Sequence, residues 1–496
     1  MIVNGQVLTA ARSERNTVTP MLPFKQAMES PCMLQELLIN KIKTEVERRF
    51  LNRKYRGFEL CQIIEDKMYW KVMEDPEIER LFRSGSLRVD EARIDRVINE
   101  KIDQIRMGPL EYSIRVIKDV LLWLLSRVRR GNKTPVDVVI PVNQKKYFTY
   151  TEMIMERLEQ EGKVARYYVF SKARREINGA VGRSRIMKEG RTFPIFWNPA
   201  YYLAANVCRS IDKVLGTWLD YRPQKALIVE GDTSILHTIG FVSRVTGCET
   251  SCLQWGSIGT SVPKTGWRNM PFDRFLAWGE FFRESVELYN PGIEVRTVGH
   301  PNLEVRTGTK INGIRHKTDD SPRIVLFAVQ KIMKPFINGE DLDRFIHTAV
   351  DTARQMPEHT IRIRSHPNYP IPAEIKKRYA HIRNIEWHDY FSASLDESLK
   401  NTLVCVTISS TLSFEAMNYG AVPVFLKVNN IRLYLHGIGH LFNKITGNGI
   451  RHVAEPDEIV DVIKTIAAMN LNNFDTDFLF KETGRAAVNN IVAELN

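Results

Sequence analysis

The sequence predicts an α/β protein with two doubly wound parallel sheets and an additional, mostly helical N-terminal region. Short apolar runs alternate with helical stretches from about residue 135, which is the pattern of βαβ units. The same alternation restarts after a loop at 307–322 that is rich in Gly, Asp, Ser and Lys. A chain of 496 residues also exceeds what one hydrophobic core usually organises, which favours two domains plus an appendage.

Composition indicates a soluble globular protein, with 43% hydrophobic and 26% charged residues. The sequence has no secretory signal pattern and no run of about 18 apolar residues, so we expect a cytoplasmic protein without a spanning helix. Six scattered cysteines favour reduced thiols. Cys248 and Cys252 lack a nearby second pair of ligands, so we expect neither a metal site nor a cofactor.

The chain is basic, with 70 Lys and Arg against 58 Asp and Glu and a net charge of +12. Such a balance favours anionic partners, among them nucleotides, phosphorylated lipids and acidic sugars. A basic surface without a specific partner is an equally good interpretation. No nucleic-acid-binding signature accompanies the charge, so no nucleic-acid partner is expected.

Residues 1–130 form the predicted helical N-terminal region. Within it, 112–130 (YSIRVIKDVLLWLLSRVRR) predicts a basic amphipathic helix. Such a helix suits an anionic membrane surface, which would place the protein at the inner face of the cytoplasmic membrane. The alternative, which the VLLWLL segment favours because it is apolar on all sides, is a buried helix that docks this region onto the first sheet.

Two Rossmann-like domains follow, at 131–306 and 307–496. Buried parallel strands are predicted for the first domain at 136–143, 164–171, 225–232, 249–256 and 274–279, and for the second at 323–330, 359–367, 401–409 and 421–428. Helical segments separate the strands, and a final helix at 481–496 is expected to pack back on one of the sheets. A cleft between two such sheets is a natural ligand site.

The segment SSTLSFEAMNYG places three hydroxyl residues, Ser409, Ser410 and Thr411, where a buried strand gives way to a helix. A helix start offers unpaired N–H groups, and hydroxyls add donors, so this turn predicts a phosphate site. Glu415 lies one turn further on the same face and suits a ribose diol. Simple helix capping by one hydroxyl is the alternative, and Gly420 is the expected C-terminal cap.

The segment RIRSHPNYP contributes His366 at the end of another strand of the second domain. We expect His366 to reach the same crevice, where it can donate to a phosphate oxygen and help neutralise a departing phosphate. Pro367 biases His366 towards an extended backbone. Arg364, two residues earlier, is a second expected anion contact.

The segment LIVEGDTS ends an apolar strand of the first domain with two carboxylates, Glu230 and Asp232. At the carboxyl end of a strand a carboxylate faces the crevice, where it can act as a base or a nucleophile. Asp232 is the preferred catalytic residue, helix capping is its alternative role, and Glu230 is the alternative carboxylate. Gln254, Gly256 and His300 are weaker candidates for donor or acceptor contacts, although His300 suits a hinge as well.

The order of strand-end carboxylate, His-Pro motif and Ser-Ser-Thr motif in two linked α/β units resembles bacterial GT-B glycosyltransferases, over roughly 135–470. The most similar groups use CMP-activated sialic acid or Kdo. The resemblance implies that Asp232 acts on the sugar or the acceptor, and that His366, Ser409 and Ser410 hold the CMP phosphate. The EGD order differs from the sialyltransferase motif, and the Glu-x7-Glu pattern of many retaining enzymes is missing.

The sequence therefore predicts a metal-independent glycosyltransferase that moves an acidic sugar from a CMP donor to a hydroxyl of a glycan or lipid-linked acceptor. A CDP-polyol phosphotransferase is a serious alternative, because that group also has an His-Pro motif and a hydroxyl-rich helix start. Two further alternatives are a transferase using a UDP or GDP sugar and a non-catalytic nucleotide-sugar-binding protein.

Overall fold

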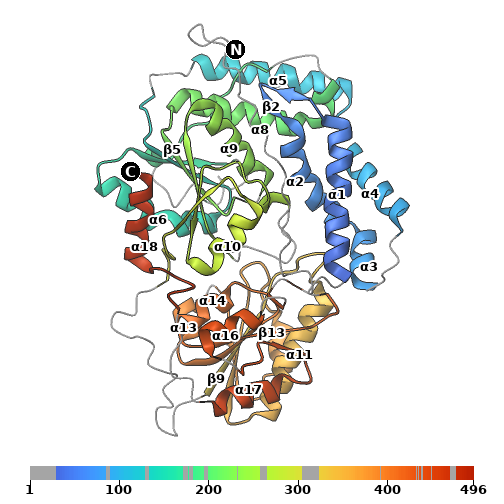
Figure 1. Ribbon diagram of the computed structural model, residues 1–496, viewed down its shortest axis with the longest axis vertical. Coiled ribbons are helices and arrows are strands. Elements are labelled where there is room, and N and C mark those ends of the chain that lie inside the picture. The colour runs from blue at the N-terminus through green and yellow to red at the C-terminus, as the bar shows by residue number, and fades with distance from the viewer. Residues whose placement is uncertain are drawn as a thin grey trace.

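The computed structural model describes residues 30–84, 90–128, 133–170, 177, 183–194, 199–231, 233–256, 265–303, 323–390, 392–431, 433, 435–436, 439–447, 449–469 and 476–496. Within these ranges the chain forms a helical N-terminal part and two units, each built on a six-stranded parallel sheet (Figure 1). This arrangement confirms the predicted fold class of two Rossmann-like parallel sheets with an extra helical region. The predicted linker at 307–322 and the residue Asp232 lie outside the described residues.

The N-terminal part consists of helices around a short antiparallel hairpin. Its elements are α1 (Ser30–Phe50), β1 (Lys54–Tyr55), β2 (Phe58–Glu59), α2 (Leu60–Met73), α3 (Pro76–Ser84), α4 (Glu91–Asp103) and α5 (Pro109–Val128). Helices α1, α2 and α4 pack on one another, and α2 also packs on helices of the first unit. In Figure 1 these helices stand beside the first unit, and α3 reaches down towards the second.

The first sheet has the strand order β4-β3-β5-β6-β7-β8, with all neighbours parallel. Its strands are β3 (Val138–Val142), β4 (Ala165–Val169), β5 (Lys225–Val229), β6 (Glu249–Leu253), β7 (Arg274–Ala277) and β8 (Glu294–Thr297). Its helices are α6 (Lys145–Gln160), η2 (Arg183–Arg185), α8 (Pro199–Tyr221), α9 (Ser234–Thr246), η3 (Thr265–Trp267) and α10 (Glu280–Tyr289). The chain order reverses between β3 and β5, and ligands of open α/β sheets bind at such switch points.

The second sheet has the order β11-β10-β9-β12-β13-β14, again parallel throughout. Its strands are β9 (Arg323–Ala328), β10 (His359–Arg364), β11 (Ile385–His388), β12 (Thr402–Thr407), β13 (Val422–Leu426) and β14 (Val453–Ala454). Its helices are α11 (Gly339–Gln355), α12 (Ala373–Arg378), α13 (Leu395–Leu399), α14 (Leu412–Met417), η4 (Gly439–Phe442), α16 (Asn443–Thr446) and α17 (Ile459–Ala468). The switch point lies between β9 and β12.

The C-terminal helix α18 (Gly484–Leu495) returns to the first unit and packs on α6. In Figure 1 it lies next to α6, above the second unit rather than among its helices. The N–H of His300 donates to the carbonyl of Glu482, and the N–H of Gly484 donates to the carbonyl of His300. The chain therefore crosses between the units twice, and its last residues belong structurally with the first sheet.

Helix α3 of the N-terminal part also contacts the second unit. Arg83 Nη2 lies 2.7 Å from Asp341 Oδ2, and the rings of Phe82 and Phe336 are 5.6 Å apart. Lys334 Nζ lies 3.1 Å from a carboxylate oxygen of Glu79. The N-terminal helices therefore link the two sheet-bearing units rather than extending one of them.

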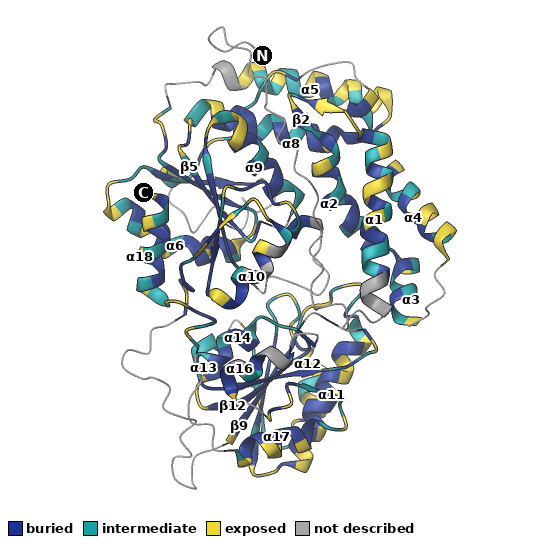
Figure 2. Cartoon of the chain, viewed as in Figure 1, coloured by how far each residue is buried: buried dark blue, intermediate teal, exposed yellow. Residues whose placement is uncertain are grey.

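Helix α5 differs from the expectation of a buried docking helix. One face packs on α8, where the rings of Tyr112 and Tyr202 are 4.7 Å apart. The opposite face is exposed along much of its length, as the yellow residues of α5 in Figure 2 indicate. The expectation of burial was wrong because, among the described residues, α8 and the segment 191–193 cover one side of α5 and leave the other side exposed.

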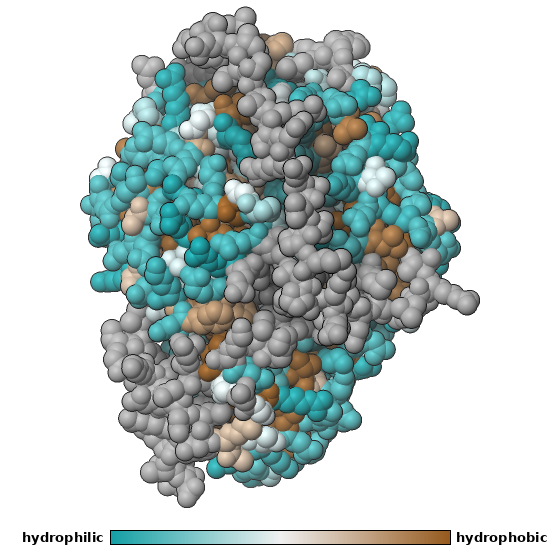
Figure 3. Space-filling model, in the orientation of Figure 1, coloured by the Kyte–Doolittle hydropathy of each residue, from teal (hydrophilic) through white to brown (hydrophobic). Residues whose placement is uncertain are grey.

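The face of the molecule in Figure 3 is largely hydrophilic, with small brown patches between polar side chains. Among the described residues, no helix combines the length and hydropathy needed to cross a bilayer.

Candidate active site at the junction of the two sheets

Three adjacent strands of the second sheet deliver polar residues to one edge. Gln330 and Lys331 follow β9, and His366 follows β10. Ser409, Ser410 and Thr411, which we call the hydroxyl turn, follow β12. Carboxyl ends of neighbouring parallel strands meet at the same edge, so these residues surround the switch point of the second sheet. The N–H of Ser409 donates to Gln330 Oε1 at 2.6 Å, which joins the loop after β9 to the hydroxyl turn.

In the hydroxyl turn, Ser410 makes capping hydrogen bonds, whereas Ser409 and Thr411 do not use their hydroxyls in this way. The N–H of Ser410 donates to Thr407 Oγ1 at 2.7 Å, and Ser410 Oγ accepts from the N–H of Leu412 at 3.2 Å. Ser410 therefore has the capping role that was the alternative interpretation of the triplet. Within the described part of the chain, the hydroxyls of Ser409 and Thr411 have no hydrogen-bond partner, which leaves two donors for a ligand.

Helix α14 is shorter than the predicted helical segment, since it spans only Leu412–Met417. Gly420 ends it at φ +82°, and the N–H of Ala421 donates back to the carbonyl of Ala416 at 3.1 Å. This is a Schellman ending, so the expected glycine cap is present. A helix of six residues contributes little dipole. Anion binding at this turn must therefore depend on side chains.

His366 is half-buried, and its ring orientation follows from its neighbours. Its Nδ1 accepts from the N–H of Asn368 at 3.0 Å, so the neutral ring carries its proton on Nε2. Burial is the main cause, and the charges of Lys331 and Lys146 the smaller one, of a His366 pKa that is lowered to about 4. At neutral pH the imidazole is therefore an uncharged N–H donor in a positive environment.

Lys146 and Lys331 are functional candidates that the sequence reasoning missed. Lys146 lies in the first turn of α6, directly after β3 of the first sheet, with its Nζ 4.9 Å from the ring centre of Trp255. Lys331 follows β9 of the second sheet. Their position after the first strand of each sheet was the available signal, because such residues border the switch points. Together they bring one cation from each unit to His366.

Glu230 lies at the switch point of the first sheet, directly after β5, in a left-handed backbone conformation at φ +74°. Gly231 follows at φ +73°, and a Cβ there would lie 2.4 Å from Cys252 Sγ. A non-glycine residue at positive φ costs free energy, and such strain gathers at functional sites. This tight turn precedes Asp232, the preferred catalytic residue, whose position the structure does not describe.

Two buried oxygen atoms close to this turn lack partners among the described residues: Asn143 Oδ1, after β3, and Thr233 Oγ1, before α9. Buried polar atoms without partners are rare in folded proteins. These atoms flank the switch point of the first sheet from its two sides. The first sheet therefore offers an amide oxygen, a hydroxyl and the carboxylate of Glu230, whereas the second offers hydroxyls and an imidazole N–H.

The two units touch directly at this junction. His300 Nε2 lies 3.6 Å from Glu415 Oε1, and a Cβ on Gly256 would lie 3.5 Å from Thr411 Cγ2. The ring of Phe414 packs on Phe282 at 5.2 Å. The expected cleft is therefore bridged at these points, and Glu415 faces His300 of the first unit.

Two residues that were expected to contact a ligand, Gln254 and Arg364, are instead hydrogen-bonded to neighbouring protein groups. Gln254 is fully buried; its Oε1 accepts from the N–H of Trp278 at 2.8 Å and its Nε2 donates to the carbonyl of Gly256 at 3.0 Å. Arg364 is also buried, and its Nη1 donates to the carbonyl of Ala393 at 2.9 Å and to Ser398 Oγ at 2.5 Å. Both side chains shape loops near the junction, so neither is placed to bind a ligand directly.

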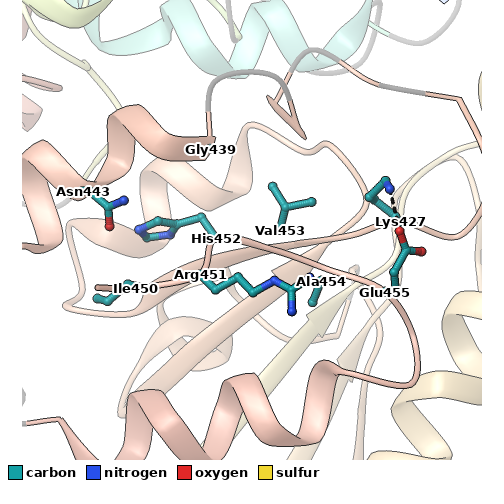
Figure 4. Close-up of a pocket in the computed structure, with 9 residues that line it drawn as sticks. All are labelled: Lys427, Gly439, Asn443, Ile450, Arg451, His452, Val453, Ala454 and Glu455. Atoms are coloured by element: carbon teal, nitrogen blue, oxygen red, sulfur yellow. Dashed lines mark hydrogen bonds and ion pairs between the residues drawn. The ribbon is translucent and has the colours of Figure 1, made fainter. Parts of the chain in front are cut away.

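The hollow of about 360 Å³ in Figure 4 is a different feature. It borders β13 and β14, on the side of the second sheet away from His366. Lys427 pairs with Glu455 across it at 2.5 Å, and Arg451 pairs with Glu458. Its cations are thus already neutralised, which makes it a poor phosphate site compared with the junction.

No protein-family model and no curated protein matches the chain. Solved structures with a similar fold include a UDP-GlcNAc 2-epimerase from Neisseria meningitidis (12% identity, TM-score 0.48, covering 72% of this chain and 98% of that one) and MurG from Acinetobacter baumannii (11%, 0.48, 73% and 99%). The lipopolysaccharide outer core galactosyltransferase WaaB is a third (13%, 0.41, 72% and 99%). At such identities and TM-scores, these likenesses are too distant to assign an activity.

Proposed function

We propose that this chain is a glycosyltransferase that takes a sugar from a nucleotide-activated donor, with the donor phosphate held between the two sheets. The observation that carries the proposal is His366 at the edge of the second sheet: its Nδ1 accepts from Asn368, which leaves Nε2–H as a donor, and the charges of Lys331 and Lys146, one from each unit, lower its pKa. The hydroxyls of Ser409 and Thr411 supply further donors beside it. A set of hydroxyl and imidazole donors together with two cations fits a phosphate oxyanion.

The proposed reaction divides its chemistry between the units. The bond between the anomeric carbon and the donor phosphate breaks, and the leaving phosphate receives hydrogen bonds from His366 and charge from the two lysines. The acceptor hydroxyl forms the new bond to that carbon and gives its proton to a carboxylate at the end of β5. Asp232 is our preferred base, and Glu230 is the second choice. Protein cations neutralise the leaving group, so the proposal needs no metal.

Glu415 keeps its proposed role at the ribose of the nucleotide. Its carboxylate is one helical turn from Thr411, so a nucleotide phosphate at the hydroxyl turn would bring the ribose diol within its range. The 3.6 Å approach of His300 to Glu415 would then place His300 beside the sugar-nucleotide as well.

For the donor we propose a CMP-activated acidic sugar, because the His-Pro motif at His366 and the Ser-Ser-Thr motif at 409–411 resemble those of CMP-sugar transferases. A UDP-activated sugar is the second candidate, because two lysines beside one histidine also suit the two phosphates of a nucleoside diphosphate. For the acceptor we propose a hydroxyl of a cell-surface glycan or glycolipid.

Calorimetry with CMP, UDP and CDP-glycerol, followed by turnover of the matching activated sugars in the presence of EDTA, tests the proposal. We expect one nucleotide to bind and its sugar conjugate to be consumed. His366→Asn should weaken that binding about tenfold or more, whereas the exposed His381→Asn should not.

Three results would oppose the proposal. Turnover of CDP-glycerol alone would make the chain a polyol phosphotransferase. Nucleotide binding without turnover of any activated sugar would make it a binding protein. Equal nucleotide affinity of His366→Asn and His381→Asn would show that His366 does not bind the phosphate, which would contradict the proposed phosphate site.

A further inference from the structure

Helix α5 carries an exposed stripe that no part of the proposed catalytic site uses. Its side chains are large, aliphatic and between 47% and 76% exposed: Leu110, Ile114, Ile117, Leu121, Leu124 and Leu125. Their spacing of three and four residues places them on one side of the helix. The opposite side packs on α8, so the stripe points away from the protein. For comparison, other exposed large apolar residues of the described chain are scattered singly, which needs no explanation.

The charges of α5 favour one kind of occupant. Lys118 is exposed beside the stripe, and Arg115 lies next to it. The acidic residues of the helix are neutralised: Glu111 pairs with Arg115 at 2.8 Å, and Asp119 lies 3.2 Å from Arg191. The stripe is therefore an aliphatic surface with the exposed cation of Lys118 beside it. That combination matches the acyl boundary and the negative headgroups of an anionic bilayer.

We propose that the stripe of α5 lies in the surface of an anionic membrane and holds the protein there without crossing it. The proposal goes beyond the glycosyltransferase assignment, because it concerns a helix outside both sheet-bearing units. It is also independent of the donor and of the acceptor. A helix that lies in the interface buries one apolar face and keeps its cations at the headgroups, and α5 has such a face with Lys118 beside it.

Co-sedimentation of the full chain with vesicles tests the proposal. We expect binding to vesicles of phosphatidylcholine with phosphatidylglycerol, and about tenfold weaker binding to phosphatidylcholine alone. The variant Ile114→Gln/Ile117→Gln/Leu121→Gln should lose most of the binding. These side chains are exposed, so the variant should keep its fold, which circular dichroism and nucleotide binding check.

Two matched controls make the result specific. Leu51→Gln/Leu219→Gln/Val245→Gln removes three equally exposed apolar side chains elsewhere and should bind vesicles like the unaltered chain. Lys118→Glu should weaken binding to the anionic vesicles only, whereas Lys377→Glu, with the same charge change on exposed α12, should not.

The proposal is overturned if the full chain does not bind anionic vesicles, or if both triple variants bind equally well. Sedimentation velocity tests the alternative occupant of the stripe, a second copy of the chain. A dimer that the α5 triple variant dissociates, with no vesicle binding, would show that a second copy covers the stripe instead. Unchanged nucleotide affinity throughout keeps this test separate from that of the proposed function.

Discussion

The carboxyl edges of the two sheets face the same junction with opposite chemistry. The edge of the first sheet presents Glu230 and Gly231 in left-handed conformations, close to buried oxygen atoms that have no partner among the residues described. The edge of the second presents the Nε2–H of His366 and the hydroxyls of Ser409 and Thr411, which have no partner in the described part of the chain. A tight, strained turn suits a group that must be held in one orientation to move a proton, whereas a set of donors suits a charge that develops and leaves.

The largest expected effect concerns the carboxylate of the first edge. Asp232→Asn should lower kcat by about 10²–10⁴-fold, because the acceptor hydroxyl loses its base, with nucleotide affinity unchanged. Steady-state kinetics with calorimetry separate the two quantities. Glu230→Gln is the matched comparison. If Glu230→Gln lowers kcat to this extent and Asp232→Asn does not, the base is Glu230. If neither variant lowers kcat, neither carboxylate at the edge of the first sheet is the base.

The strained turn should be the most sensitive backbone position of the junction. Gly231→Ala introduces a Cβ at φ +73° and 2.4 Å from Cys252 Sγ, and we expect it to lower the free energy of unfolding by about 2–4 kcal/mol. Denaturant unfolding measures the loss. Gly247→Ala is the control, since Gly247 has a similar φ of +74° and open space around it. Equal losses in both variants would show that the backbone angle alone, and not the close packing, sets the cost.

Lysines from the two units should contribute comparably to nucleotide binding. Lys331→Met and Lys146→Met should each weaken affinity about tenfold, because each removes a cation next to the phosphate. Lys377→Met, on the exposed face of α12, should have no effect. An effect of Lys331→Met alone would confine the phosphate site to the second unit and contradict a site shared across the junction.

The smallest expected effect is a pH dependence of nucleotide affinity. The pKa of His366 is lowered to about 4 in the free protein, and a bound phosphate stabilises the imidazolium and raises it. The bound state then takes up more protons, so affinity should rise severalfold as pH falls from 7 towards 5. Calorimetry across this range checks the slope. His366→Asn should flatten the part of the slope that comes from this residue, and a slope that is unchanged in His366→Asn would exclude the imidazole as its source.

Much of the fold could be predicted from the sequence because parallel strands buried on both faces are continuous apolar runs. All nine predicted strands are present, with ends that differ by a few residues. Strands β8, β11 and β14 were missed, since they are short and only partly buried, which leaves no such run. The burial of α5 was predicted wrongly, because an apolar sequence does not reveal how many neighbouring elements pack on the helix.

The site was predicted less completely, because its residues come from five separate loops. His366 and the hydroxyl turn were proposed from local motifs at strand ends, and the structure places both at one edge of the second sheet. Lys146 and Lys331 carry no motif and became visible only when the strand order placed them at the two switch points. Conversely, Gln254 and Arg364 carry suitable chemistry but are held by neighbouring backbone groups, which no local pattern reveals.

The most direct test of the shared phosphate site is an NMR titration of the His366 imidazole, with and without saturating nucleotide. The account predicts a pKa of about 4 in the free protein, and a clearly higher pKa when a nucleotide phosphate lies beside the ring. It also predicts a higher free-protein pKa in Lys146→Met, because a cation of the first unit then no longer opposes protonation. A His366 pKa that responds neither to nucleotide nor to Lys146→Met would contradict the central claim that the two units jointly hold the phosphate.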